Sequence, residues 1–189
     1  MSGRLAILLA WICLTLPGAN AHAFDATVEP LASQGTLQPA FAPWDNVEGL
    51  ISESINSAGK QILVQAYLLT SKKIASILIA AQRRGVDVRV LADAEQFDKN
   101  ETSKLRDLAE AGVLVWLETK YQNAHNKIIV IDAGTVDATV ITGSFNFTWS
   151  AQHRNAENIL ILRKNPLLAA RYAQNWERHR QDATPYNKQ

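Results

Sequence analysis

The stretch HNKIIVID (residues 125–132) places a histidine and a lysine two residues apart at the start of an apolar run that ends in an aspartate. The apolar residues in its middle are typical of a buried strand. Side chains two residues apart in a strand share a face, so His125 and Lys127 are expected to point to the same side. Because a lysine within an otherwise apolar strand is costly without an anionic partner, the stretch is expected to bind an anion.

A second stretch, GSFN (residues 143–146), follows the next apolar run and carries Ser144 and Asn146 on one face. Two neighbouring strands would thus bring together an imidazole, a cation, a hydroxyl and an amide. This set suits a phosphodiester, because a neutral imidazole can attack phosphorus and form a covalent phosphohistidine. The Lys127 ammonium and the Asn146 amide can stabilise the charge that develops on the phosphate oxygens.

Each of these residues also has an ordinary structural explanation. Lys127 alone would be an edge lysine, Asp132 a turn residue, and Gly143-Ser144 a tight bend. Only the joint pattern favours catalysis over these explanations. One histidine and scattered carboxylates lack the usual spacing of metal ligands, so the sequence predicts a metal-independent reaction and no cofactor.

Around these stretches, apolar strand patterns alternate with amphipathic helix patterns. Strands are expected over residues 36–42, 61–69, 86–91, 113–117, 126–131, 138–142 and 157–162, and helices over residues 45–59, 70–85, 101–111 and 166–180. Asp45 and either Thr70 or Ser71 are expected as helix N-caps. The alternation predicts an α/β fold with a mixed, mainly parallel β-sheet flanked by helices on both faces.

The first residues follow a different pattern. Arg4 precedes the short apolar run Leu5–Leu16, and Ala21–Ala23 reads as a small-x-small cleavage signal. The apolar run is too short for a membrane-spanning helix, which takes about 20 residues. A basic start, a short apolar centre and an A-x-A end are typical of a secretory signal peptide, which indicates a periplasmic or secreted protein. The expected organisation is a signal peptide over residues 1–23, a lead-in segment over 24–43 and a single catalytic domain over 44–189.

Composition adds few constraints. The 189-residue chain is 47% hydrophobic and 20% charged, as is ordinary for a globular domain. Cleavage after Ala23 removes Cys13, the only cysteine, and with it disulfide and thiolate chemistry. Cleavage also removes Arg4, so the net charge of +1 falls to zero and gives no sign of nucleic-acid binding. The basic residues that gather after Ser150 fit either phosphate attraction or a solvated helix face.

At these residues the chain resembles the phospholipase D superfamily. Its HKD motif is matched by His125-x-Lys127-x4-Asp132, followed by Gly143-Ser144-x-Asn146. Further stretches are similar to the small, exported, single-motif bacterial endonucleases of that superfamily, namely ILVQAY (62–67), RGVDVR (84–89) and GSFNFT (143–148). The segment between the motif aspartate and Gly-Ser, residues 133–142, is longer than is usual in the family, and a longer hairpin would accommodate it.

The resemblance covers nearly the whole chain after residue 23 and implies a phospholipase D/nuclease-like sandwich. It also implies a role for each matching residue. These roles are nucleophile for His125, phosphate binding for Lys127 and Asn146, a pocket hydrogen bond for Ser144, orientation of the histidine for Glu157, and either a direct or a fold-holding role for Asp132.

Cleavage of a phosphodiester also needs an acid on the leaving-group side. The chain has one His-x-Lys pair, because neither His153 nor His179 is followed two residues later by lysine. Single-motif members of the family form two-fold homodimers with both motifs in one cleft, so the resemblance implies a homodimer in which one His125 attacks and the other donates the proton. The alternative is that His153 supplies the acid within one chain.

A phosphate-binding motif admits DNA, RNA and phospholipid head groups alike. The compact length, the basic C-terminal third and Trp149, which can stack on a base, favour nucleic acid. Phe145, Phe147 and Trp149 equally suit a membrane surface, although the two phenylalanines are expected in the core. The sequence therefore predicts a sequence-non-specific endonuclease acting on DNA or RNA. The first alternative is a phospholipase D, and the second is a non-catalytic nucleic-acid-binding protein on the same fold.

Overall fold

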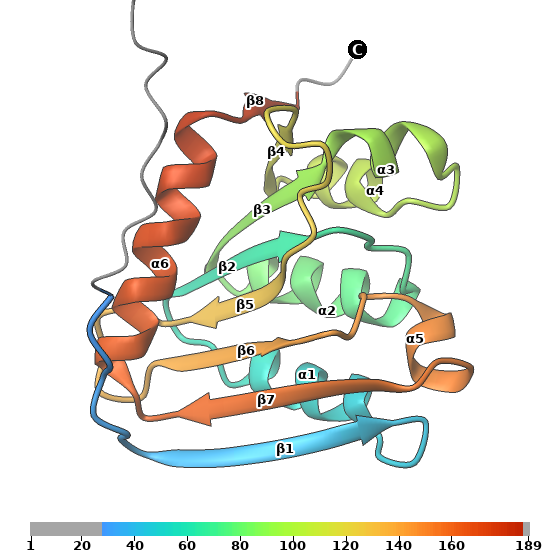
Figure 1. Ribbon diagram of the computed structural model, residues 1–189. Coiled ribbons are helices and arrows are strands. Elements are labelled where there is room, and N and C mark those ends of the chain that lie inside the picture. The colour runs from blue at the N-terminus through green and yellow to red at the C-terminus, as the bar shows by residue number, and fades with distance from the viewer. Residues whose placement is uncertain (1–27, 187–189) are drawn as a thin grey trace, which may run out of the picture. The chain divides into compact units, whose positions relative to one another are not determined.

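The computed structural model describes residues 28–186, so the expected signal peptide lies outside the described residues. The chain from Leu31 onward forms one compact unit. At its centre lies a single sheet of eight strands in the order β1-β7-β6-β5-β2-β3-β4-β8 (Figure 1). The strands are β1 (Thr36–Ala42), β2 (Gln61–Ala66), β3 (Asp87–Asp93), β4 (Leu114–Glu118), β5 (Lys127–Ile131), β6 (Thr139–Gly143), β7 (Glu157–Arg163) and β8 (Thr184–Pro185).

The sheet is mixed, as expected, but the expectation that it is mainly parallel is wrong. Only β2–β3 and β3–β4 pair in parallel, and the other five pairings are antiparallel. Parallel neighbours need a long crossover, and helix α2 supplies it between β2 and β3, as α3 and α4 do between β3 and β4. The β5–β6 hairpin keeps a continuous register from Ile128–Thr142 to Ile131–Thr139. The long segment after Asp132 therefore lies in the hairpin loop and leaves the strand pairing intact.

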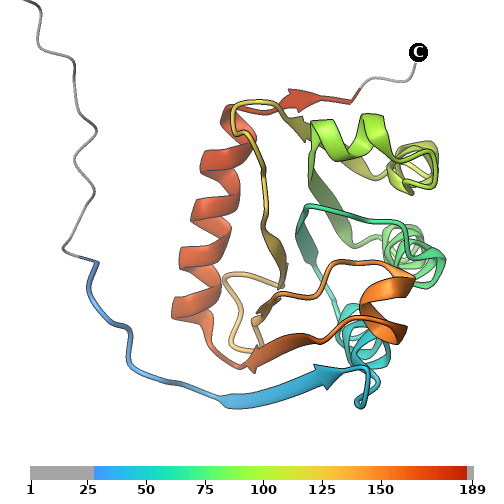
Figure 2. The same ribbon diagram turned by 45° about the vertical axis from the view of Figure 1, so that its right-hand side comes forward.

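Helices cover both faces of the sheet (Figures 1 and 2). One face carries α1 (Val47–Asn56), α2 (Lys72–Arg83), α3 (Ala94–Lys99) and α4 (Leu105–Glu110), and α6 (Pro166–Gln181) crosses the other. The single-turn helix α5 (Trp149–His153) lies at one end of the sheet. No helix in the described part of the chain has the length and apolar character needed to span a membrane.

Two apolar layers hold these helices to the sheet. On the α1–α2 face, Ile51, Leu78 and Ile129 are fully buried. On the α6 face, the buried Trp176 packs edge-on against Trp116, and its indole Nε1 donates to the backbone oxygen of Val64 at 2.9 Å. This bond satisfies the indole N–H inside the core and fixes α6 over the central strands.

All the expected strands and helices are present within a few residues of their expected ends. The sequence did not indicate α3, α5 or β8, which have six, five and two residues and are too short for a periodic pattern. Ser71 is confirmed as the N-cap of α2. The N-cap of α1 is Asn46 rather than Asp45, whose carboxylate instead accepts from the backbone N–H of Phe41.

Strand β1 lies within the segment expected to lead into the domain. All of its residues pair with β7, so the folded sheet begins before residue 44. Helix α6 contacts β6, β5, β2, β3 and β4, and Figure 1 shows that the helix stands at one side of β7 and β1. The side chains of β1 and β7 on the α6 side of the sheet form what we call the open sheet face: Leu37, Pro39, Phe41, Leu160 and Leu162. Leu37 is 55% exposed and Phe41 is 51% exposed.

Candidate active site

The ends of three neighbouring strands bring five of the six predicted site residues to one end of the sheet. By the edge of the sheet we mean here this line of strand ends, not an outermost strand. Lys127 begins β5, Gly143 ends β6 and Glu157 begins β7. Because β6 pairs antiparallel with both β5 and β7, these three ends meet at the same edge. His125 lies two residues before β5, Ser144 directly follows β6, and Asn146 lies two residues further along the chain.

The ammonium group of Lys127 is held inside this edge. The residue is only 7% exposed, and its Nζ donates to the backbone oxygen of His125 at 2.6 Å. The Nζ also lies 4.8 Å from the centre of the Tyr67 ring. Burial lowers the pKa of Lys127 to about 8, and the negative charge of Glu157 acts in the opposite direction. The site therefore holds a partly dehydrated cation.

The backbone on both sides of His125 is fixed, whereas its side chain is exposed. The N–H of Ala124 donates to the buried carboxylate of Asp93 at 2.7 Å, and the N–H of Tyr67 donates to the oxygen of Asn126 at 3.0 Å. The imidazole packs on the Tyr67 ring, with 4.3 Å between the ring centres and 55° between the planes. A histidine held in this way is open to an incoming substrate.

Glu157 is linked to the serine of the Gly-Ser pair. The Ser144 hydroxyl donates to Oε2 of Glu157 at 2.5 Å, and the Asn155 amide donates to Oε1 at 3.0 Å. The structure therefore pairs Glu157 with Ser144 and Asn155 rather than with His125. Orientation of His125 by Glu157 stays a prediction.

Gly143 allows β6 and β7 to approach closely enough for this contact. A Cβ atom at Gly143 would lie 2.2 Å from the backbone oxygen of Asn158 on β7. The next residue, Ser144, donates its N–H to that same oxygen at 3.1 Å. The glycine thus fixes where the serine hydroxyl lies.

Asn146 lies between two phenylalanines that anchor its backbone. Phe145 is 1% exposed and Phe147 is 2% exposed, which confirms that both belong to the core. The N–H of Phe147 donates to the oxygen of Leu68 and so ties this segment to the chain just after β2. Within the described part of the chain, the buried Oδ1 of Asn146 has no hydrogen-bond partner. Such an atom is expected to be satisfied by water or by a ligand.

Asp132 is the predicted residue that the structure does not bring to this cluster. It follows the last residue of β5, at the opposite end from Lys127. Its backbone has a positive φ of 51°, and its carboxylate accepts from the N–H groups of Gly59, Lys60 and Gln61 at 2.7–2.8 Å. Of the two roles that the resemblance left open for Asp132, these contacts support holding the fold.

Three residues at this edge were not assigned a role from the sequence. Tyr67 contacts both His125 and Lys127, Asp93 fixes the backbone before His125, and Asn155 contacts Glu157. An aspartate at a strand end before a helix is a recognisable cap signal, and Asp93 does cap α3. Nothing local indicates that Tyr67 lies beside His125, because the two residues are 58 positions apart in the chain.

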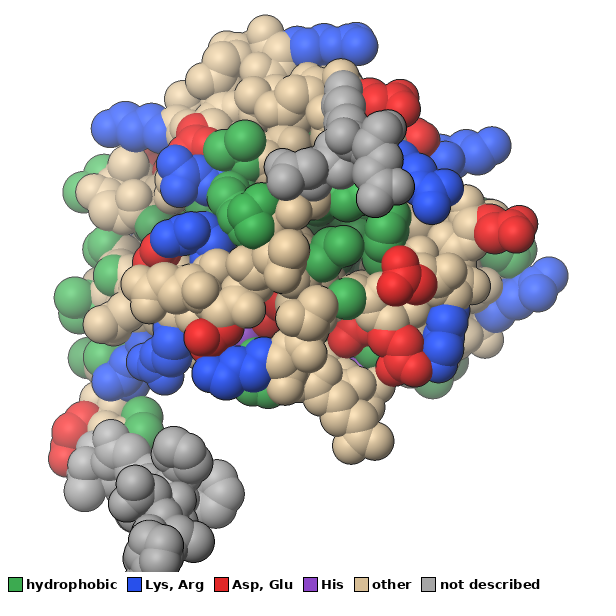
Figure 3. Space-filling view, turned by 90° about the horizontal axis from the view of Figure 1, so that it is seen from above, with side chains coloured by type: hydrophobic (Ala, Val, Ile, Leu, Met, Phe, Trp, Pro, Cys, Tyr) green, Lys and Arg blue, Asp and Glu red, His purple; other side chains and the backbone are tan. Residues whose placement is uncertain are grey.

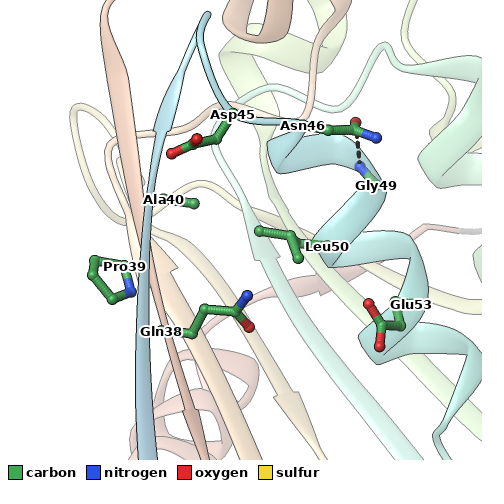
Figure 4. Close-up of a pocket in the computed structure, with 8 residues that line it drawn as sticks. All are labelled: Gln38, Pro39, Ala40, Asp45, Asn46, Gly49, Leu50 and Glu53. Atoms are coloured by element: carbon green, nitrogen blue, oxygen red, sulfur yellow. Dashed lines mark hydrogen bonds between the residues drawn. The ribbon is translucent and has the colours of Figure 1, made fainter.

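Other surfaces lie outside this cluster. An open pocket of about 480 Å³ between β1 and α1 contains none of the predicted residues, and Asp45 and Glu53 are among those that line it (Figure 4). On the face seen in Figure 3, Lys and Arg side chains are interspersed with Asp and Glu. Within residues 28–186, no group of three or more His, Cys, Asp or Glu side chains is arranged to hold a metal ion.

Comparison with known proteins agrees with this fold. The family description "Cardiolipin synthase, PLD-like domain" matches residues 51–180. A protein named phospholipase D from Rickettsia prowazekii is 41% identical over 144 residues, which cover 76% of this chain and 67% of that protein. A mitochondrial cardiolipin hydrolase from Xenopus laevis is 33% identical over 85% of this chain and 75% of its own length.

Among solved structures, the phospholipase D family member Nuc from Salmonella typhimurium matches with a TM-score of 0.75 and 29% identity, over 81% of this chain and 99% of Nuc. The fold and the clustered His, Lys, Ser and Asn define a phosphodiesterase of the α/β sandwich class. The chain belongs to the phospholipase D superfamily.

The contacts of Asp132 give a first prediction. Asp132→Ala should lower the free energy of unfolding by about 2–3 kcal/mol, because hydrogen bonds to a charged acceptor are lost, and should leave kcat/KM of the folded protein unchanged. Urea unfolding and turnover of a chromogenic phosphodiester measure the two effects. Asp137→Ala, in the same loop, is the control. A fall in kcat/KM at undiminished stability would instead give Asp132 a direct role.

The lowered pKa of Lys127 gives a second prediction. The side chain is charged below its pKa of about 8 and neutral above it, so phosphate binding should weaken as the pH rises through that value. A profile of kcat/KM, which reports the free enzyme, should therefore fall on the alkaline side near pH 8. Lys127→Arg, whose guanidinium stays charged, should lose this limb. An alkaline limb at the ordinary pKa of lysine would contradict the prediction.

Proposed function

We propose that this phosphodiesterase is a metal-independent endonuclease that cleaves DNA, or RNA, without sequence preference through a covalent phosphohistidine. The observation that carries the proposal is the pairing of a dehydrated cation, Lys127, with an exposed imidazole, His125, at the edge of the sheet. A phosphodiester supplies both the anion that the ammonium lacks and the electrophilic phosphorus for the imidazole.

The reaction proceeds in two displacements. A ring nitrogen of His125 attacks phosphorus, the bond from phosphorus to the leaving oxygen breaks, and that oxygen takes a proton from an acid on the opposite side. Water then attacks the phosphohistidine and gives a proton to the same acid, and the P–N bond breaks. Lys127 holds a non-bridging oxygen throughout. A half-turn of the Asn146 amide would exchange its buried Oδ1 for Nδ2 and present a donor to a second non-bridging oxygen.

A helix beside the cluster supports nucleic acid as the substrate. Trp149 on α5 is 55% exposed, and the Arg154 guanidinium lies 5.1 Å from the centre of its ring. An aromatic ring with an adjacent cation suits a base and a backbone phosphate. The basic C-terminal third contributes less, since Arg180 is paired with Glu177. Phosphate contacts alone carry no sequence information, so cleavage should be non-specific.

Phospholipase D activity is the alternative, and the curated relatives favour it. Five Rickettsia proteins that are 38–42% identical to this chain are named phospholipase D. The same two displacements would then hydrolyse a phospholipid head group. The intact cluster of His125, Lys127, Ser144 and Asn146 argues against a non-catalytic nucleic-acid-binding protein on the same fold.

The direct test is plasmid degradation by the mature chain in excess EDTA. We expect the wild type to degrade the plasmid and His125→Ala to be inactive, because no nucleophile remains. Lys127→Ala and Asn146→Ala should cleave more slowly, by about 10²-fold or more, since each removes a group that stabilises charge on the phosphate. Retention of full activity by His125→Ala would refute the mechanism. Absence of cleavage by both proteins, with phosphatidylcholine hydrolysis by the wild type alone, would instead establish the phospholipase.

We further propose that the enzyme is a homodimer, exported to the periplasm or secreted, in which the partner's copy of His125 is the acid. The single His-x-Lys pair supports the dimer, and so does the open sheet face, which leaves apolar side chains exposed on one side of β1 and β7. Apolar surface of this kind is typical of a face that another protein covers. Export rests on the pattern in residues 1–23.

The dimer is tested by sedimentation together with cleavage. The wild type should sediment as a dimer. The double variant Leu37→Asp/Phe41→Asp should sediment as a monomer and lose cleavage, because charge is placed on the face where the partner binds. Val136→Asp is the matched control, since Val136 is 78% exposed in the hairpin loop at the other edge of the sheet. An active wild-type monomer would contradict the proposal.

A further inference from the structure

Tyr67 directly follows β2 and contacts His125, the proposed nucleophile, and Lys127, the proposed phosphate-binding residue. Its ring centre lies 4.3 Å from that of the His125 imidazole and 4.8 Å from Nζ of Lys127. We propose that Tyr67 is a positioning residue whose ring holds the imidazole of His125 and the ammonium of Lys127 in the arrangement needed for attack on phosphorus. The inference rests on the proposed phosphohistidine mechanism and adds a residue to it.

The ring is well placed to act in this way because its backbone is anchored to the strand that carries the motif. The N–H of Tyr67 donates to the backbone oxygen of Asn126, the residue between His125 and Lys127. One step earlier, Ala66 pairs with Lys127 in the antiparallel ladder of β2 and β5. The pairing of β2 with β5 thus fixes the position of the Tyr67 backbone, which carries the ring, relative to the start of β5.

For Lys127, the ring replaces part of the lost hydration. The face of an aromatic ring attracts a cation, and the other neighbours of the Nζ are the backbone oxygen of His125 and the negative charge of Glu157. Without the ring, water would reach the ammonium, and the negative charge of Glu157 would act on it without the competing attraction of the ring. The ammonium would then be drawn away from the place where it meets a phosphate.

For His125, the ring limits rotation of the imidazole. No hydrogen bond to the imidazole is found within residues 28–186, so the tilted contact with the Tyr67 ring is the contact that sets its orientation. Reacting groups must be aligned closely, and a displacement of about 1 Å can cost about 10²-fold in rate. The Tyr67 hydroxyl contributes little, because its contact with Oδ1 of Asn123 is long, at 3.4 Å.

The test compares Tyr67→Leu with Tyr67→Phe in single-turnover cleavage of a chromogenic phosphodiester by the dimeric protein. We expect Tyr67→Leu to slow formation of phosphohistidine, trapped by an alkaline denaturing quench because its P–N bond is labile in acid, by about 10–100-fold. Tyr67→Phe, which keeps the ring, should restore the wild-type rate. Tyr121→Leu is the control, since Tyr121 packs on His179 in the same kind of ring contact but has no part in the cluster. Thermal unfolding of each variant separates lost stability from lost positioning.

Two results would overturn the inference. One is a wild-type trapping rate in folded Tyr67→Leu, and the other is a Tyr67→Phe rate as low as that of Tyr67→Leu, which would move the role from the ring to the hydroxyl. Failure of the proposed function is recognised separately, because it would leave His125→Ala active or leave the wild type without a trapped intermediate.

Discussion

The buried ammonium group of Lys127 is the constraint on which this edge of the molecule depends. A cation taken out of water must be compensated by nearby polar groups or by an anion. The fold offers it one backbone oxygen, the face of one aromatic ring and the field of Glu157. None of these is a full ion pair, so the site favours an incoming anion. The arrangement explains why a lysine stands at the start of a strand that is otherwise entirely apolar.

Strand direction assembles the surroundings of that cation. Antiparallel pairing of β5 with β2 places the start of β5 beside the end of β2, where Tyr67 follows. Antiparallel pairing with β6 then brings the end of β6 to the same edge, where Ser144 follows. Short polar contacts complete the site, because Asp93 holds the backbone before His125 and Glu157 holds the serine. Reversal of either strand pairing would scatter these groups to opposite edges.

Much of this could be predicted from the sequence, and the exceptions have physical reasons. Apolar runs such as Ile128–Ile131 predicted every long strand, and helix periodicity predicted the long helices. Strand direction was not readable, because it depends on which distant segments pair, and so the sheet was expected to be mainly parallel. Five of the six site residues converge as the motif implied. The place of Tyr67 could not be predicted, since its contact with His125 exists only once β2 and β5 have paired.

The length of strand β5 sets the distance between a residue of the site and a residue that holds the fold. At one end it presents Lys127 to the site, and just beyond the other end Asp132 clamps the backbone that enters β2. Because successive side chains alternate between faces, one residue more or fewer in between would turn one end of the strand away from its task. The hairpin loop that follows has no such restriction. The spacing His-x-Lys-x4-Asp is therefore set by the length of strand β5. A sequence search for that spacing detects a strand of this length as well as a set of catalytic residues.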